Sequence, residues 1–244
     1  MKKNKVVNSV SEEKKKKQPN VHVNILNWGP FVLHFKISEK FHKLLLEGAK
    51  QARIADRDYR TRLAGHIREE YAYNDLNTYT PYVAGMMRAY EQALREWRNS
   101  GKDEPYNKYF LKSMWVNYQK QNEFNPPHNH SDRYSFVTYL SVPEELKEEN
   151  KNCVSTSTGP GSIMFTYGDG PKEYITYQSY FPEERDIFIF PASLTHYVCP
   201  FKSNCERVSV SGNILTDLPL HAAPPDMSIS VVDGYGEKPS KIKT

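Results

Sequence analysis

The sequence predicts a mainly β domain, a sandwich or barrel, with helices flanking its N-terminal side. From about residue 109 onward, short apolar segments follow one another, and runs rich in Gly and Pro separate them. Two segments with helical periodicity come before residue 109. Many short strands with such turns are typical of sandwiches and barrels, whose loops leave room for a site at the mouth.

A strand and two helices are expected in the first half of the chain. Residues 31–37 place alternate apolar side chains on one face, as a half-buried strand does. Ser38 is a suitable N-cap for the first helix. The second helix is expected to begin at Thr80 and Pro81 and to end at Gly101.

Six further strands are expected in the second half. Their segments are rich in β-branched and aromatic residues, and the turns at 158–161 and 168–171 contain Gly and Pro. The expected strands span 111–119, 134–142, 162–167, 174–180, 186–190 and 206–214.

The chain of 244 residues is long enough for one well-buried domain. We expect a disordered basic tail over 1–20 and a single domain over 21–215, followed by an extended arm over 216–244. Within the domain, the helical support covers 38–101 and the β core covers 109–215. Aromatic residues make up 13% of the chain, which argues against disorder over most of its length.

The net charge of +4 comes from the tail. Residues 1–20 hold seven lysines and two glutamates, so the other 224 residues sum to −1. The body of the protein is therefore not basic, and nucleic acid is not expected as a partner beyond weak contacts of the tail. The lysine run Lys14–Lys17 is expected to be solvated, with a weak tether to a polyanion as the alternative.

No membrane or secretory segment is predicted. No apolar stretch reaches the length that crosses a bilayer, and no apolar core follows the N-terminal lysines. Cys153, Cys199 and Cys205 are odd in number and lack the spacing of a zinc site, which indicates free thiols in a reducing compartment. We expect a cytoplasmic location, in the host cytoplasm if a phage encodes the protein.

Three of the eight histidines have the spacing of metal ligands. His128 and His130 are two residues apart, and side chains at that spacing in extended backbone point to the same side, roughly 7 Å apart along the chain. His196 comes from a distant strand. Three such ligands cover one face of an octahedral ion and leave positions open for a chelating cosubstrate and O₂, as in the facial-triad iron oxygenases.

An arginine follows the third histidine at a distance of eleven residues. Arg207 and Ser209 share one face of the strand 206–214 because side chains alternate along a strand. A guanidinium that points into a barrel forms a bidentate, charge-assisted clamp for a carboxylate, and a neighbouring hydroxyl adds a donor. The pair therefore predicts a receptor for an acid ligand.

The order of these motifs resembles the Fe(II)/2-oxoglutarate oxygenase superfamily, in particular its prolyl-hydroxylase-like branch. It is similar to uncharacterised members from tailed phages of marine cyanobacteria. The resemblance covers roughly 25–215, and the histidine followed by Arg-x-Ser is its most specific part. It implies a double-stranded β-helix core of the jelly-roll or cupin-like type. The matching stretches are Trp115–Tyr118, Pro127–His130, Ser135–Leu140, Gly161–Gly168, Phe190–His196 and Arg207–Ser209, with weaker similarity at Trp28–Pro30 and Leu63–Gly65.

The resemblance implies Fe(II), 2-oxoglutarate and O₂ as cofactors, and hydroxylation of a substrate with release of succinate and CO₂. His196 is then the distal iron ligand, and Arg207 with Ser209 binds the far carboxylate of 2-oxoglutarate. Three more residues are candidates for cosubstrate hydrogen bonds or for the pocket wall, with a simple core role as the alternative: Tyr118, Tyr139 and Asn117.

The proximal ligands depart from the family pattern, which is His-x-Asp. Aligning Pro127–His128 with the family motif places His130 where Asp is expected and gives a site of three histidines. The other register uses His130 and Asp132, a literal His-x-Asp. We favour His128 and His130. Three neutral imidazoles leave the ion its full charge, which bears on affinity and reactivity.

Two other functions fit the same residues. One is a non-catalytic barrel that binds a metal or a 2-oxoacid and serves as a sensor or a phage scaffold module. The other is a cupin-type metal enzyme, which also uses three histidines but has no need of Arg207. For the oxygenase, the expected substrate is a protein side chain, with prolyl as the first guess, or a small molecule. The oligomeric state is not predicted.

Overall fold

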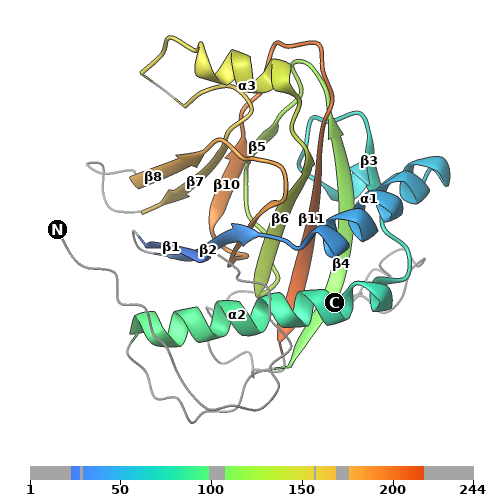
Figure 1. Ribbon diagram of the computed structural model, residues 1–244, viewed down its shortest axis with the longest axis vertical. Helices are drawn as coiled ribbons and strands as arrows, with labels where there is room; N and C mark the ends of the chain where they lie inside the picture. The colour runs from blue at the N-terminus through green and yellow to red at the C-terminus, as the bar shows by residue number, and fades with distance from the viewer. Residues whose placement is uncertain (1–22, 28–29, 99–107, 157, 169–175, 217–244) are drawn as a thin grey trace, which may run out of the picture.

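Two antiparallel β-sheets face each other, and two long helices cover the outer face of the larger sheet (Figure 1). The computed structural model describes residues 23–27, 30–98, 108–156, 158–168 and 176–216. The predicted tail, Gly101 and the arm from residue 217 onward lie outside the described residues. Within them the mainly β class with flanking helices is confirmed.

The larger sheet has seven strands and the smaller has four. The larger has the order β1 (Val23–Asn27), β2 (Phe31–Lys36), β9 (Asp186–Pro191), β6 (Tyr134–Ser141), β11 (Arg207–Thr216), β4 (Tyr109–Gln119) and β3 (Glu70–Ala72). The smaller has the order β5 (Asn125–His128), β10 (Thr195–Val198), β7 (Ile163–Tyr167) and β8 (Thr176–Tyr180).

All six strands predicted in the second half are present, and the predicted strand at 31–37 is β2. Four strands were not predicted: β1, β3, β5 and β10. Three of these, β3, β5 and β10, have only three or four residues, too few for an alternating pattern to stand out. In addition, β5 contains Pro126 and Pro127, and it lies at the edge of its sheet, where a missing backbone N–H is tolerated.

Three α-helices are described. They are α1 (Glu39–Ile54), α2 (Thr80–Arg98) and the unpredicted α3 (Glu144–Lys151). The predicted cap of α1 is confirmed, because the hydroxyl of Ser38 accepts a hydrogen bond from the N–H of Phe41 at 3.2 Å. At α2, the hydroxyl of Thr80 instead donates to the carbonyl of Leu76 at 2.9 Å.

The alternation of side chains in β4 divides the core in two. Val116 and Tyr118 point to the helices and join the core that α1 and α2 cover. Trp115, Asn117 and Gln119 point the other way and line a cavity between the two sheets. A second apolar cluster, with residues from both sheets, fills the rest of the space between them. Local strand geometry thus decides which side chains reach the cavity.

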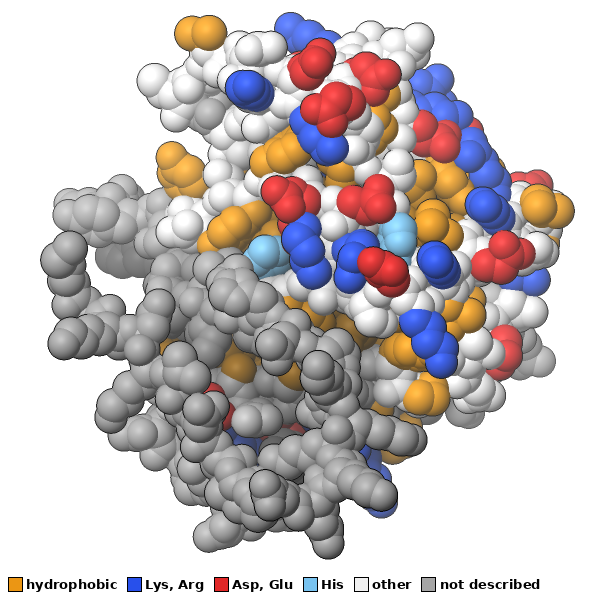
Figure 2. Space-filling model, in the orientation of Figure 1, with side chains coloured by type: hydrophobic (Ala, Val, Ile, Leu, Met, Phe, Trp, Pro, Cys, Tyr) orange, Lys and Arg blue, Asp and Glu red, His pale blue; other side chains and the backbone are white. Residues whose placement is uncertain are grey.

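None of the helices that the structure describes is long and apolar enough to cross a membrane. On the face shown in Figure 2, basic and acidic side chains are interspersed and form no large basic patch. The three cysteines, Cys153, Cys199 and Cys205, are free thiols, as the sequence predicts.

Candidate metal centre and its cavity

A cavity of about 200 Å³ opens between the two sheets. Its walls come from β4, β6 and β11 of the larger sheet, from β5 and β10 of the smaller sheet, and from the loop at 62–65 before β3. Contacts of His66 with Phe124 hold the end of that loop in place. The backbone N–H of His66 donates to the carbonyl of Phe124 at 2.8 Å, and the two rings stack. The cavity is therefore built from segments that are far apart in the sequence.

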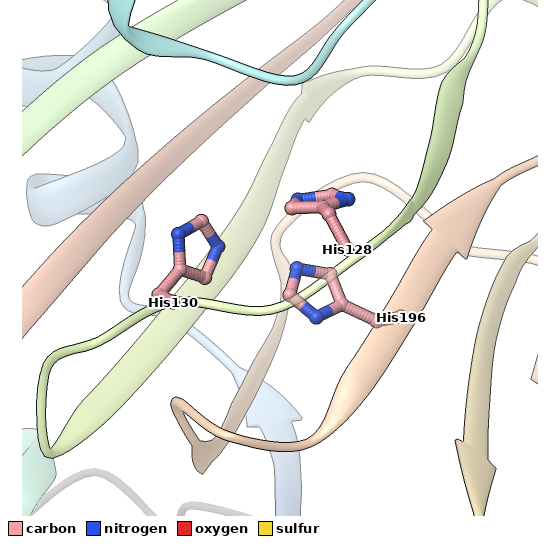
Figure 3. Close-up of side chains that lie close together, drawn as sticks. All are labelled: His128, His130 and His196. Carbon is pink, nitrogen blue, oxygen red and sulfur yellow. The ribbon is translucent and has the colours of Figure 1, made fainter. Parts of the chain in front are cut away.

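Three histidines meet at this cavity (Figure 3). His128 ends β5, and it is the direct cross-strand partner of His196 in β10. His130 lies just beyond β5, and its N–H donates to the carbonyl of Ala192 at 2.8 Å. One ring nitrogen from each imidazole can be chosen so that all three lie within 4.8 Å of one another. The arrangement can bind one metal ion with three nitrogen ligands.

Backbone carbonyls orient two of the imidazoles. The Nδ1 of His128 lies 2.7 Å from the carbonyl of Pro126, and the Nδ1 of His196 lies 2.9 Å from the carbonyl of Leu194. Because a carbonyl can only accept, each Nδ1 carries the proton, and each Nε2 keeps its lone pair for a metal. Such bonds fix the tautomer and the orientation of metal-ligating histidines in general.

Burial keeps the three imidazoles neutral. Desolvation is the main cause that lowers the pKa of His128. Desolvation, with a smaller contribution from His128, lowers the pKa of His130 to about 4 and that of His196 to about 3. At neutral pH a metal therefore need not displace protons from these nitrogens. A set of neutral imidazoles suits Fe(II) and other borderline divalent metals.

The alternative register with Asp132 is not assembled in this structure. The carboxylate of Asp132 accepts from the Nζ of Lys112 at 2.7 Å. Among the described residues, the cluster with metal-ligand geometry contains the three histidines and no carboxylate. The geometry therefore groups His128 and His130 with His196 and places Asp132 in an ion pair with Lys112.

Arg207 is buried beside the cluster, with 2% of its surface exposed. It donates hydrogen bonds to the side-chain oxygen of Gln119, its cross-strand neighbour, and to the carbonyl of Gly161. In the described part of the chain, its Nε has no hydrogen-bond partner and no carboxylate pairs with it. Burial lowers the pKa of Arg207. A buried cation without a counter-ion is costly, so the geometry fits an anionic ligand in the cavity.

Four polar side chains form a row across the larger sheet. In strand register, Tyr139 of β6 lies next to Ser209 of β11, Ser209 next to Asn117 of β4, and Asn117 next to Glu70 of β3. All four line the cavity. The hydroxyl of Tyr139, the Oδ1 of Asn117 and the Oε2 of Glu70 are buried without a hydrogen-bond partner in the structure. Buried polar atoms normally have partners, so the row is suited to bind polar ligands.

Tyr139 and Ser209 lie at the Arg207 end of this row. The guanidinium carbon of Arg207 is 5.2 Å from the centre of the Tyr139 ring. Burial raises the pKa of Tyr139 to about 12, so its hydroxyl stays a neutral donor. The amide nitrogen of Asn117 lies 3.4 Å from the hydroxyl of Ser209, which leaves the amide oxygen as an acceptor.

The expectation that Tyr118 binds the cosubstrate or forms the pocket wall is corrected by the structure. Its side chain belongs to the core on the helix side, and the guanidinium of Arg53 lies 4.1 Å above its ring. It does not line the cavity, because adjacent residues of a strand face opposite sides and Asn117 takes the inner side. The structure places Tyr118 in the core, which is the alternative that the sequence analysis gave for it.

Gln119 and Glu70 are polar cavity residues that were not identified from the sequence. Gln119 could have been found, because it shares the inner face of β4 with Asn117 by period two. Glu70 could not, because β3 has three residues and its pairing with β4 depends on a distant contact.

Comparisons with known proteins agree with this geometry. The family model described as a putative 2OG-Fe(II) oxygenase matches residues 113–213, which run from β4 to β11 and contain the three histidines and Arg207. No curated protein matches the sequence. The family model supports the 2OG-Fe(II) oxygenase superfamily, and with the histidine cluster it supports Fe(II) and 2-oxoglutarate as cofactors.

Solved structures are similar to this chain over most of their length. OsALKBH1 is 12% identical, with 78% of this chain and 99% of that chain covered and a TM-score of 0.50. A Pseudomonas putida prolyl-4-hydroxylase is 14% identical, with 77% and 93% covered and a TM-score of 0.49. HygX from Streptomyces hygroscopicus with nickel and 2-oxoglutarate bound is 10% identical, with 77% and 83% covered and a TM-score of 0.44. At such identities a likeness concerns the fold alone. The two antiparallel sheets, together with the likeness to OsALKBH1, confirm the predicted double-stranded β-helix core.

Proposed function

We propose that the protein is an Fe(II)- and 2-oxoglutarate-dependent oxygenase that hydroxylates its substrate. One observation carries the proposal: a cluster of three neutral histidines and a buried arginine without a counter-ion line the same cavity. The first group suits a metal and the second suits a dicarboxylate that chelates it.

The metal would be held by His128, His130 and His196. The carbonyls of Pro126 and Leu194 direct the Nε2 atoms of His128 and His196 as ligands, so little reorganisation is needed on binding. Because no carboxylate joins the set, the ion keeps its full double charge, which favours an anionic cosubstrate.

The far carboxylate of 2-oxoglutarate would be bound by Arg207, with the hydroxyls of Ser209 and Tyr139 as further donors. The guanidinium is held in position by Gln119 and Gly161, and its Nε is still free to donate. A clamp that is already oriented loses little side-chain entropy when the ligand binds.

When bound, iron and 2-oxoglutarate would supply the oxidising chemistry, in which O₂ converts 2-oxoglutarate to succinate and CO₂ and one oxygen atom enters a substrate C–H bond. The chain itself shields the site. The rings of Phe190 and Phe165 have their centres 4.7 Å and 6.2 Å from that of His196, and Trp115 lies 6.1 Å from His130. These rings give the metal position apolar surroundings.

The test is anaerobic addition of Fe(II) and 2-oxoglutarate to the purified protein while a visible charge-transfer band is followed. The band should appear only when both are present. Admission of O₂ should then release succinate even without substrate. A protein that binds neither metal nor 2-oxoglutarate would contradict the proposal.

Succinate release also separates the rival functions. A sensor or scaffold module would form the band and release no succinate. A cupin-type enzyme would bind the metal without needing Arg207 for its cosubstrate, and the burial of Arg207 in the cavity speaks against it. The similarity to phage-encoded members, a prolyl or other protein substrate, and a cytoplasmic location stay predictions from the sequence.

A further inference from the structure

The row of polar residues across the larger sheet continues past Ser209 and Tyr139, the proposed 2-oxoglutarate donors, to Asn117 and Glu70. Neighbouring strands of a sheet are about 4.8 Å apart, so Glu70 in β3 lies roughly 10 Å from Ser209 in β11, two strands away. The carboxylate receptor of Arg207, Ser209 and Tyr139 is at the other end. Glu70 therefore faces a part of the cavity that the cosubstrate carboxylate does not fill.

Glu70 is a buried acid without a cation. Only 1% of its surface is exposed, and among the described residues its Oε2 has no hydrogen-bond partner. Its side chain lines the cavity together with His128 and His130. The Oδ1 of Asn117, the next residue along the row, is a second buried acceptor without a partner. When Glu70 is ionised, these two side chains offer acceptors on one wall, which suit a ligand that donates hydrogen bonds.

The charges around Glu70 favour a positive ligand. Burial is the main cause that raises the pKa of Glu70 to about 8, and the nearby carboxylate of Glu123 adds to it. Arg60 opposes this rise, but its Nε and Nη2 donate to the two carboxylate oxygens of Asp58, and its side chain is half exposed to solvent. Arg62 is exposed at the rim of the cavity, where solvent screens it.

The backbone of Gly65 passes close to Glu70. A Cβ on Gly65 would lie 2.8 Å from the Oε1 of Glu70 and 2.3 Å from the Oδ1 of Asn125. The glycine therefore allows the loop at 62–65 to pass close to both oxygens. A third acceptor, Asn125 at the start of β5, thus lies on the wall opposite Asn117.

From this arrangement we infer that Glu70 and Asn117 form a subsite for a cationic amine, so that the substrate carries a protonated amino group. The inference rests on the proposed function for the reaction at the metal. An ammonium group offers three N–H donors, which match the oxygens of Glu70, Asn117 and Asn125. Glu70 then selects and positions the substrate while the histidines hold the metal.

Binding of the amine would ionise Glu70. Because the free carboxyl holds a proton at pH 7, the ion pair with an ammonium group releases up to one proton to the solvent. A carboxyl with a purely structural role would bind no amine and release no proton on its addition.

The experiment is calorimetric titration of the full chain with n-butylamine at pH 7, anaerobically, with Fe(II) and 2-oxoglutarate present. The neutral isostere n-butanol is titrated in parallel, and buffers of different ionisation enthalpy give the proton count. We expect the amine to bind at least about tenfold more tightly than the alcohol and to release a proton. Glu70→Gln should weaken amine binding at least about tenfold and abolish the proton release.

Glu69→Gln is the matched control. Glu69 is the preceding residue, and its carboxylate faces the other side, where it pairs with Arg53 and Lys120. This variant should bind n-butylamine as the wild type does. Thermal unfolding midpoints show whether both variants are folded.

Failure of this inference is distinct from failure of the proposed function. If the charge-transfer band forms in the wild type but n-butylamine does not bind, the amine subsite is wrong and the oxygenase stands. If Glu70→Gln and the wild type bind the amine equally, the subsite is also wrong. If the amine binds through Glu70 but no band forms, the oxygenase proposal fails and the subsite stands.

Discussion

His128 and His196 face each other as cross-strand partners of β5 and β10, with ring centres 4.3 Å apart. The chain between them contains four strands, β6, β7, β8 and β9. The metal position therefore exists only when the smaller sheet has formed.

Removal of a histidine should abolish tight metal binding. His196→Ala leaves two imidazole ligands, and we expect Fe(II) affinity to fall by at least about 100-fold, since loss of a hydrogen bond that only orients a ligand typically costs about 10–100-fold. Metal titration by calorimetry measures this. Asp132→Asn is the control and should change affinity less than about twofold, because Asp132 pairs with Lys112. Loss of metal binding in the Asp132 protein would restore the other register.

Arg207→Lys should weaken 2-oxoglutarate binding by about 10–100-fold while metal binding persists. A lysine is a point charge and cannot reproduce a bidentate clamp, and hydrogen bonds to charged groups contribute about 1.5–3 kcal/mol. The concentration of 2-oxoglutarate that half-saturates the charge-transfer band gives the affinity. An unchanged value would show that the carboxylate binds elsewhere.

Two tyrosines on opposite faces of the larger sheet form a matched pair. Tyr139→Phe removes a cavity hydroxyl that has no other partner, and we expect 2-oxoglutarate affinity to fall about fivefold, as for one hydrogen bond of about 1 kcal/mol. Tyr118→Phe should leave the affinity unchanged because its ring packs on the helix side. Equal effects of the two variants would contradict the assignment of Tyr139.

Glu70 should make the stability depend on pH with a definite sign. Its pKa in the folded protein, about 8, is above the ordinary value of 4.5, so its contribution is fully present below pH 4.5 and is lost as the pH rises through 8. Relative to Glu70→Gln, the wild type should lose on the order of 3 kcal/mol of unfolding free energy between pH 5 and pH 8. Urea unfolding of both proteins at each pH measures this. The buried histidines titrate in both proteins, so their contribution cancels. A constant difference would mean that Glu70 is ionised throughout.

Much of the β core followed from the sequence because strand alternation is a local property. The inner face of β11 was identified from period two, and the structure places Arg207 and Ser209 there. The same rule separates Tyr118 from Asn117 in β4, because adjacent side chains of a strand face opposite sides of the sheet. The short strands β5 and β10 were missed, although the histidines that they contain were identified by their spacing.

The sequence by itself determined the mainly β fold, the candidate ligands and the arginine, since these depend on residue type and on spacing along one strand. Only the tertiary structure decided which histidines meet, that Asp132 turns to Lys112, and that Glu70 ends a polar row across four strands. The physical reason is that cross-strand neighbours are set by sheet register, and register depends on the burial of both faces along the whole sheet.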